Sequence, residues 1–249
     1  GFGIKAKLAD DLPVTAIFAA GSLQHGTGVR GFLEADFFAV IDAPRPPSDD
    51  ALRKVCASLE AHYPLISVDV RRPAVVCNFD GGSEPVEVVP AYSDGGSGFW
   101  IPDPADGGDW IHSFPVEYND YLSRTYELHG GEAKKLARLV KLWKYRQQVP
   151  VSSSYLEARA AVYSTSQPML GLVEDLAHFL FELGKDRLAN IDHPTGQPST
   201  FTACSTPARY DDATSKLAEA VTVTAEASHQ ARAGHDKEAV RLLKQLFAE

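Results

Sequence analysis

The chain has 249 residues, 44% of them hydrophobic and 23% charged, which is ordinary for a globular protein with a substantial core. Its formal net charge of −9 argues against broad nucleic-acid binding, because phosphate backbones bind to basic surfaces. No apolar run approaches the roughly 18 residues of a membrane span, no signal peptide is visible, and three cysteines without metal-ligand spacing indicate a reducing, cytoplasmic setting.

The first elements are a helix end and a strand. The chain begins with Gly1-Phe2-Gly3, so we expect a processed or truncated N-terminus. Residues 4–11 predict the end of a helix, which Leu12-Pro13 terminates. The apolar segment over residues 14–20 then predicts a strand.

A glycine turn follows this strand directly. Gly21 and Ser22 offer a small side chain and a free backbone N–H, which allow the close approach of a phosphate oxygen. An ordinary tight turn would have the same sequence.

The next predicted strand, over residues 34–41, carries two acids with one residue between them. Glu34 and Asp36 share a face of the strand, and their carboxylates repel unless a cation lies between them. Mg²⁺ takes oxygen ligands and is often held by one or two carboxylates together with substrate phosphates. The alternative is an edge strand with two solvated acids.

A helix and two short strands are predicted next. Ser48 is a suitable N-cap for a helix over residues 49–63, where apolar residues recur at helical spacing. Residues 66–71 and 74–79 predict short strands.

A third acid lies in the strand predicted over residues 85–91. Asp80-Gly81-Gly82 is a turn signal before it, and the resulting hairpin can return Glu87 to the first acidic strand. Three acids from two strands would form a metal site, whereas an edge position would leave Glu87 in water.

The second half of the chain has helical patterns. Residues 93–109 predict a loop with an extended piece at 99–102, and Pro115 suits the first turn of a helix to about His129. An amphipathic helix is predicted from Glu132 onward. Its apolar face consists of Leu136, Leu139, Val140 and Trp143. Nearly opposite lies a basic face of Lys134, Arg138 and Lys141. The basic stripe is expected either to be solvated or to face an anionic substrate.

A cluster of three serines precedes the next helix. Ser152-Ser153-Ser154 offers an N-cap, with hydroxyls that serve either plain capping or phosphate binding. Further helices are predicted over residues 169–188, 211–233 and 235–248, with a Pro/Thr-rich stretch at 192–207 between the first two.

Several of these pieces form an ordered set: Gly21-Ser22, Gly26-Thr27, Glu34-x-Asp36, residues 86–91 (VEVVPA), Ile101-Pro102-Asp103, Trp110-Ile111, Lys141-Leu142-Trp143 and residues 153–157 (SSYLE). The set resembles the cGAS/DncV-like nucleotidyltransferases, the bacterial CD-NTases of the DNA polymerase β-like superfamily. The resemblance implies an α+β fold. A polymerase β-like core with a mixed sheet and flanking helices would occupy residues 1–129, and an oligoadenylate-synthetase-like helical lobe residues 130–249.

The resemblance also implies roles for particular residues. The acids would be catalytic ligands of two Mg²⁺ ions, with Mn²⁺ as an alternative, and the other residues would bind the nucleotide phosphates. The implied metal ligands are Glu34, Asp36 and Glu87, and the implied nucleotide-binding residues are Gly21, Ser22, Lys141, Lys144 and Ser153. The family usually has Asp at the first and third metal positions, so Glu34 and Glu87 imply reduced or lost activity.

The function implied is a cytoplasmic nucleotidyltransferase that joins nucleoside triphosphates into a cyclic or short linear oligonucleotide second messenger, in anti-phage (CBASS-like) signalling. Two alternatives are a catalytically degenerate nucleotide-binding regulatory protein and a toxin that adds nucleotides to tRNA or protein. We expect a monomer with a regulatory protein as a further partner and no membrane partner.

Overall fold

The structure is a computed structural model that describes residues 2–79, 84–105 and 107–247. Internal contacts divide the chain into two compact units, residues 1–120 (unit 1) and 121–249 (unit 2). The boundary falls inside helix α4 (Pro115–Leu128). The division at residues 129 and 130 stays a prediction, and it would leave the whole of α4 with the first lobe.

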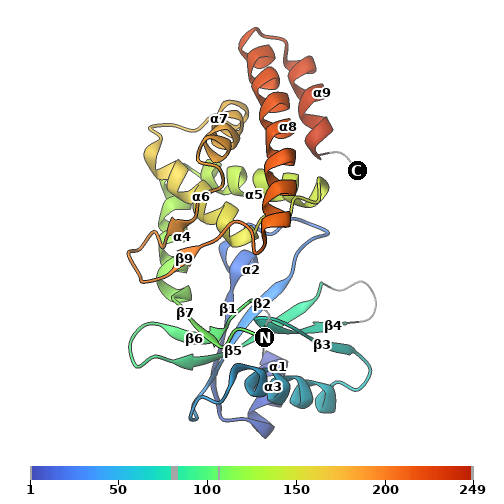
Figure 1. Cartoon of the computed structure of the whole chain (residues 1–249), viewed down its shortest axis with the longest axis vertical. Helices are drawn as coiled ribbons and strands as arrows, with labels where there is room; N and C mark the ends of the chain where they lie inside the picture. Colours follow the sequence, from blue (N-terminus) through green and yellow to red (C-terminus); the bar gives the residue numbers. More distant parts are fainter. Residues whose placement is uncertain (1, 80–83, 106, 248–249) are drawn as a thin grey trace. The chain divides into compact units, whose positions relative to one another are not determined.

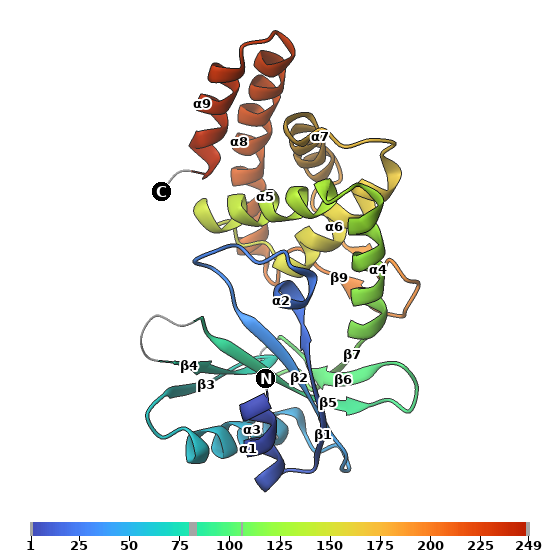
Figure 2. The ribbon, with the colours of Figure 1, turned by 180° about the vertical axis from the view of Figure 1, so that it is seen from behind.

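Unit 1 is built on a mixed β-sheet in the order β1-β2-β5-β4-β3, and β5 also pairs with β6, which pairs with β7 (Figure 2). β2 and β5 are parallel, and the other pairs are antiparallel. The strands are β1 (Val14–Ala20), β2 (Ala35–Ile41), β3 (Ser67–Arg71), β4 (Ala74–Asn78), β5 (Val86–Ser93), β6 (Phe99–Pro102) and β7 (Trp110–Ser113). The predicted mixed sheet is confirmed.

Helices α1 (Phe2–Asp11) and α3 (Ser48–His62) cover one face of this sheet (Figure 1). The core on that face includes Leu8, Leu52 and Val88, all fully buried. Because side chains alternate along a strand, the neighbours of Val88 point to the opposite face. That second face has its own apolar cluster, which includes Phe38 and Val89.

The start of α3 differs from the expectation that Ser48 is its N-cap. Ser48 is instead the first helical residue, and the N-cap is Pro47, which has no side-chain cap. The Asp109 carboxylate accepts a hydrogen bond of 3.0 Å from the Ser48 N–H, and the Ser48 hydroxyl donates to the Gly108 carbonyl at 3.2 Å. The prediction was wrong because a loop about sixty residues away supplies the cap.

Unit 2 is helical, as expected. Helix α8 packs against α7 and α9, and α5 packs against α6, α7 and α9 (Figure 1). The helices and the short strand pair of this unit are α5 (Glu132–Arg146), α6 (Ser153–Ser166), α7 (Leu172–Lys185), β8 (Ile191–Asp192), β9 (Thr200–Phe201), α8 (Pro207–Arg232) and α9 (Asp236–Phe247).

The serine cluster caps α6 as predicted. Ser152 is the N-cap, and its hydroxyl accepts a hydrogen bond of 3.4 Å from the Tyr155 N–H. The strands β8 and β9 pair antiparallel within the segment that separates α7 from α8, and no strands were predicted there. The predicted turn at Asp80-Gly81-Gly82 lies outside the described residues. Among the helices that the structure describes, none is both long and apolar enough to span a membrane.

Candidate active site

The glycine turn after β1 lies directly against one of the predicted acids. β1 continues into the short helix α2 (Gly21–His25), and Gly21 is left-handed with φ of 57°. A Cβ atom at Gly21 would come within 2.0 Å of the Asp36 Oδ2 atom. Only glycine therefore satisfies both the backbone angle and the close approach of the carboxylate.

The other end of α2 is held in place by its last residue. His25 is buried, and its Nε2 atom lies 2.6 Å from Oδ1 of Asn119, in the first half of α4. The His25 ring also contacts the Tyr118 ring edge-on, with centroids 5.5 Å apart. These contacts fix the turn that presents Gly21 and Ser22.

The sheet brings two of the predicted acids together. Asp36 of β2 and Glu87 of β5 are directly opposite each other in the parallel register. Both belong to the face that α1 and α3 do not cover, because Phe38 and Val89, two residues further along each strand, lie in the second cluster. Glu34 comes immediately before β2, and its carboxylate contacts the same arginine as the Glu87 carboxylate.

Arg71, which no sequence motif indicated, connects the two glutamates. The Arg71 guanidinium, at the end of β3, donates a hydrogen bond of 2.6 Å to Glu34 Oε1 and another to Glu87 Oε1. The Glu87 side chain is 16% exposed and that of Arg71 57% exposed. Partial burial would lower the pKa of Arg71, but the hydrogen bonds from Glu34 and Glu87 outweigh it, so the pKa is raised and the guanidinium stays charged.

The predicted metal site can be compared with this arrangement. Three carboxylates have the donor chemistry for a hard divalent cation. However, no group of three or more His, Cys, Asp or Glu side chains in the described part of the chain is arranged to hold a metal ion. The Glu34 and Glu87 carboxylates are instead paired with Arg71. As they are arranged, the three predicted ligands do not fit a metal ion.

Lys141, predicted to contact a nucleotide phosphate, is buried. Its side chain is 3% exposed and its Nζ atom lies 4.0 Å from Oε1 of Glu157, whose side chain is 4% exposed. The Tyr126 hydroxyl donates to the same Glu157 oxygen at 3.3 Å. Lys141 therefore does not belong to an exposed basic stripe with Lys134 and Arg138, because a buried carboxylate on α6 draws it to the covered face of α5.

The other two predicted phosphate contacts of unit 2 lie together. Lys144 Nζ donates a hydrogen bond of 2.6 Å to the Ser153 hydroxyl, at the first turn of α6. The Tyr145 hydroxyl lies 3.2 Å from the same oxygen, and the Lys144 ammonium lies 4.5 Å from the centre of the Tyr145 ring. A cation, two hydroxyls and a helix N-terminus thus meet at one place, and each of these groups can contact an anion.

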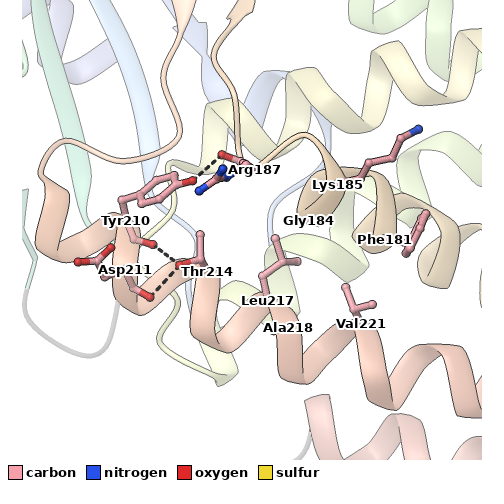
Figure 3. A pocket seen from close by; sticks show the side chains of 10 residues that line it. All are labelled: Phe181, Gly184, Lys185, Arg187, Tyr210, Asp211, Thr214, Leu217, Ala218 and Val221. Carbon is pink, nitrogen blue, oxygen red and sulfur yellow. Dashed lines mark hydrogen bonds between the residues drawn. The ribbon is translucent and has the colours of Figure 1, made fainter.

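Unit 2 also has a pocket of about 550 Å³ between α7 and α8 (Figure 3). Leu217 and Val221 form an apolar wall, and Lys185, Arg187 and Asp211 add charge. None of the predicted site residues lines this pocket.

Comparisons with known proteins identify the family of the N-terminal part and the fold of the chain. Residues 4–125 match the family model of the Second Messenger Oligonucleotide or Dinucleotide Synthetase (SMODS) domain. The sequence matches none of the curated proteins with which it was compared. Solved structures resemble the fold over most of its length.

CdnC from E. coli, in a complex with HORMA-deltaN, has a TM-score of 0.77 at 17% identity and covers 100% of this chain and 89% of its own. DncV from Vibrio cholerae, a cyclic AMP-GMP synthase bound to a linear intermediate, has a TM-score of 0.75 at 17% identity over 94% of this chain and 68% of its own. The CdnE c-di-GMP synthase from Capnocytophaga granulosa has a TM-score of 0.66 at 18% identity, over 90% of this chain and 77% of its own. Residues 4–125 are therefore a SMODS domain, and the chain has the fold of the cGAS/DncV-like nucleotidyltransferases, as its sequence motifs predicted.

Proposed function

We propose that this protein is a nucleotidyltransferase that joins nucleoside triphosphates into a cyclic or short linear oligonucleotide second messenger. The observation that carries the proposal is the juxtaposition, inside a SMODS domain, of the Gly21 turn with Asp36 and of Asp36 with Glu87. A turn without a side chain gives an anionic substrate access to the backbone next to the carboxylates on which phosphoryl transfer depends.

The chain's own residues have defined tasks in this proposal. The backbone at Gly21 and Ser22 binds the donor phosphates. Lys144 and Ser153 bind outer phosphates, and they are already within hydrogen-bonding distance of each other. Lys141 supports this region through its buried pair with Glu157 rather than by direct exposure to solvent.

The proposed cofactor is a pair of Mg²⁺ ions, with Mn²⁺ as an alternative, and the proposed ligands are Glu34, Asp36 and Glu87. When bound, such ions neutralise the charge that develops on the transferred phosphoryl group and on the oxygens on either side of it. In the structure, Glu34 and Glu87 are paired with Arg71.

The partners proposed follow from the similar proteins. CdnC has been solved in a complex with a HORMA protein, so we propose a regulatory protein as a partner of this chain too. An anti-phage (CBASS-like) signalling system is the proposed setting.

The test is synthesis from nucleoside triphosphates. The full chain is incubated with all four ribonucleotides and Mg²⁺ or Mn²⁺, and the products are identified by mass spectrometry. Asp36→Asn should lower product formation by roughly a hundredfold or more, because it removes a charge from the reacting centre. Asp42→Asn, one residue past the end of β2, is the matched control and should leave the rate unchanged. If Asp36→Asn has no effect on any product formed, the proposed site is refuted.

A second candidate function is a degenerate nucleotide-binding regulatory protein. The observation that favours it is the arginine paired with two of the three proposed ligands. It predicts that nucleotides raise the melting temperature while no pyrophosphate is released. The variant Glu34→Asp/Glu87→Asp separates the two candidates, because product from the double variant alone would show that the native glutamates have lost catalysis.

A further inference from the structure

The pocket between α7 and α8 lies wholly within unit 2, and the function proposed above uses none of its residues (Figure 3). Its volume of about 550 Å³ is within the range of sites that enclose a small organic molecule. Phe181 of α7 and Leu217 and Val221 of α8 form its apolar part. Phe181 is 53% exposed although it is large and apolar. A ligand with an apolar body would remove this surface from water.

A glycine at the end of α7 keeps the pocket open. Gly184 is helical, and a Cβ atom there would lie 3.9 Å from Val221 Cγ2, which is an ordinary contact distance. Glycine weakens a helix relative to alanine, and neither the backbone nor this contact requires it at position 184. The missing side chain leaves space between the two helices.

The charged residues of the pocket favour an anion. Lys185 and Arg187 give two positive charges and Asp211 one negative charge, in a chain whose formal net charge is −9. Lys185 Nζ lies 3.3 Å from Oε2 of Glu182, and the lysine side chain points away from Leu217 (Figure 3). Within the described residues, the Arg187 guanidinium has no hydrogen-bond or ion-pair partner. Arg187 is therefore the cation that is left for a ligand.

The backbone that carries Arg187 is held in an uncommon conformation. Arg187 and Leu188 have positive φ angles of 54° and 51°, which residues other than glycine rarely adopt. The Tyr210 hydroxyl donates a hydrogen bond of 3.0 Å to the Arg187 carbonyl (Figure 3), and Leu188 is buried. Strained backbone persists where its surroundings hold it, and it is frequent at ligand sites. Tyr210 thus fixes the segment from which the guanidinium extends.

We propose that this pocket binds a small amphipathic anion, with its apolar body against Phe181, Leu217 and Val221 and one acidic group at Arg187. The planar donors of a guanidinium match a carboxylate, sulfonate or phosphate, and the contact is charge-assisted. Asp211 repels additional negative charge, so a singly charged ligand is favoured over a nucleoside triphosphate. The site is thus separate from the nucleotide chemistry of the proposed function, and its test does not depend on nucleotide synthesis.

Two dyes with the same ring system test the class of ligand. Anilinonaphthalene sulfonate carries one acidic group, and phenylnaphthylamine has the same rings without it. The fluorescence of both dyes rises in an apolar site, so titration of the full chain measures both affinities. Arg187→Gln should weaken binding of the sulfonate about tenfold and leave that of the neutral dye unchanged, because only the sulfonate contacts the guanidinium.

The matched control for this variant is Arg232→Gln. Arg232 is the last residue of α8, pairs with Glu174 and does not line the pocket. Its replacement makes the same change in net charge, and both dyes should bind it as they bind the wild type. Asp211→Asn removes the opposing carboxylate, so it should strengthen binding of the sulfonate alone, by roughly twofold.

Substitutions of Gly184 test whether the dyes bind in this pocket. Gly184→Leu places a branched side chain in the open space and should weaken binding of both dyes roughly fivefold or more. Gly184→Ala adds only the Cβ atom near Val221, so it should keep both affinities and raise the melting temperature. Circular dichroism establishes that each variant is folded.

The outcomes decide between this ligand and other occupants. Unchanged sulfonate affinity in Arg187→Gln overturns the inference, as does an equal loss for the neutral dye, which would indicate an apolar groove without anion recognition. Failure of the sulfonate to bind the wild type, or binding that survives in a folded Gly184→Leu variant, overturns it as well. If Gly184→Leu does not fold, the opposite shifts expected from Arg187→Gln and Asp211→Asn decide, because both side chains are exposed.

Discussion

Gly21 is the residue on which the geometry of the turn depends most. Its positive φ and its contact with Asp36 are separate constraints, and a side chain violates both. Gly31, in the same unit, has an even larger φ of 84° but open space where a Cβ would lie. An alanine at Gly31 would therefore suffer backbone strain alone, whereas an alanine at Gly21 would suffer both strain and a steric clash.

Gly21→Ala should destabilise unit 1 by roughly 2–4 kcal/mol, because it combines left-handed strain with a clash against the Asp36 carboxylate. Gly31→Ala should cost about 1–2 kcal/mol, from strain alone. Urea unfolding followed by circular dichroism measures both free energies of unfolding. Equal costs for the two variants would mean that Asp36 moves away without difficulty.

Residue patterns predicted the acids but not the cation between them. Glu34, Asp36 and Glu87 stand out because acids are rare in apolar strands, and Asp36 and Glu87 do lie together. Arg71 was predicted only as part of a short strand, because local patterns do not contain the strand order that places β3 two strands from β5. Lys141 was misplaced for a similar reason, since its partner Glu157 lies on another helix.

At the scale of elements, helix α6 shows the effect of a single cap. Its N-terminal turn presents Ser153 to Lys144, and Ser152 fixes that turn by accepting a hydrogen bond from the Tyr155 N–H. The cap therefore supports both the helix and the proposed phosphate contacts.

Ser152→Ala should lower the free energy of unfolding by about 1 kcal/mol, which is typical for the loss of an N-cap. Ser166→Ala, at the other end of α6, removes an exposed hydroxyl that donates to the Tyr163 carbonyl and accepts from the Gln167 side-chain amide, and it should change stability by less than about 0.5 kcal/mol. Calorimetry of thermal unfolding measures the stability of both variants. A loss from Ser166→Ala as large as that from Ser152→Ala would contradict the capping role.

Periodicity located the long helices and most strands within a few residues, because their apolar faces repeat with the period of the element. The exceptions depend on distant contacts. The α3 cap comes from Asp109, and β8 and β9 are stabilised by pairing with each other across a segment rich in proline and threonine. Local sequence carries no record of such partners.

At the scale of the whole molecule, buried thiols and phenols in both units share one response to pH. Burial raises the pKa of Cys77 in unit 1 to about 11 and that of Tyr155 in unit 2 to about 12. The folded protein keeps these protons at a pH where the unfolded chain has lost them. Unfolding then releases protons, so the free energy of unfolding falls as pH rises.

Below pH 9 these buried groups should leave the free energy of unfolding independent of pH. Between about pH 9 and 12, from the ordinary pKa values to the raised ones, the free energy of unfolding should fall progressively. Cys77 alone accounts for a loss on the order of 2 kcal/mol. Urea unfolding at a series of pH values measures the slope. Cys77→Ala should flatten it between pH 9 and 11, and an unchanged slope would show that the thiol is not protected.

Helix α4 has a consequence for how this chain can vary in evolution. Asn119, near its start, contacts His25 behind the glycine turn, and Tyr126, near its end, bonds to Glu157 beside Lys141. Each contact holds α4 within its own unit, Asn119 in unit 1 and Tyr126 in unit 2. Relatives that keep the glycine turn should therefore keep a hydrogen-bonding side chain at position 119, and relatives that keep the buried Lys141 pair should keep one at position 126.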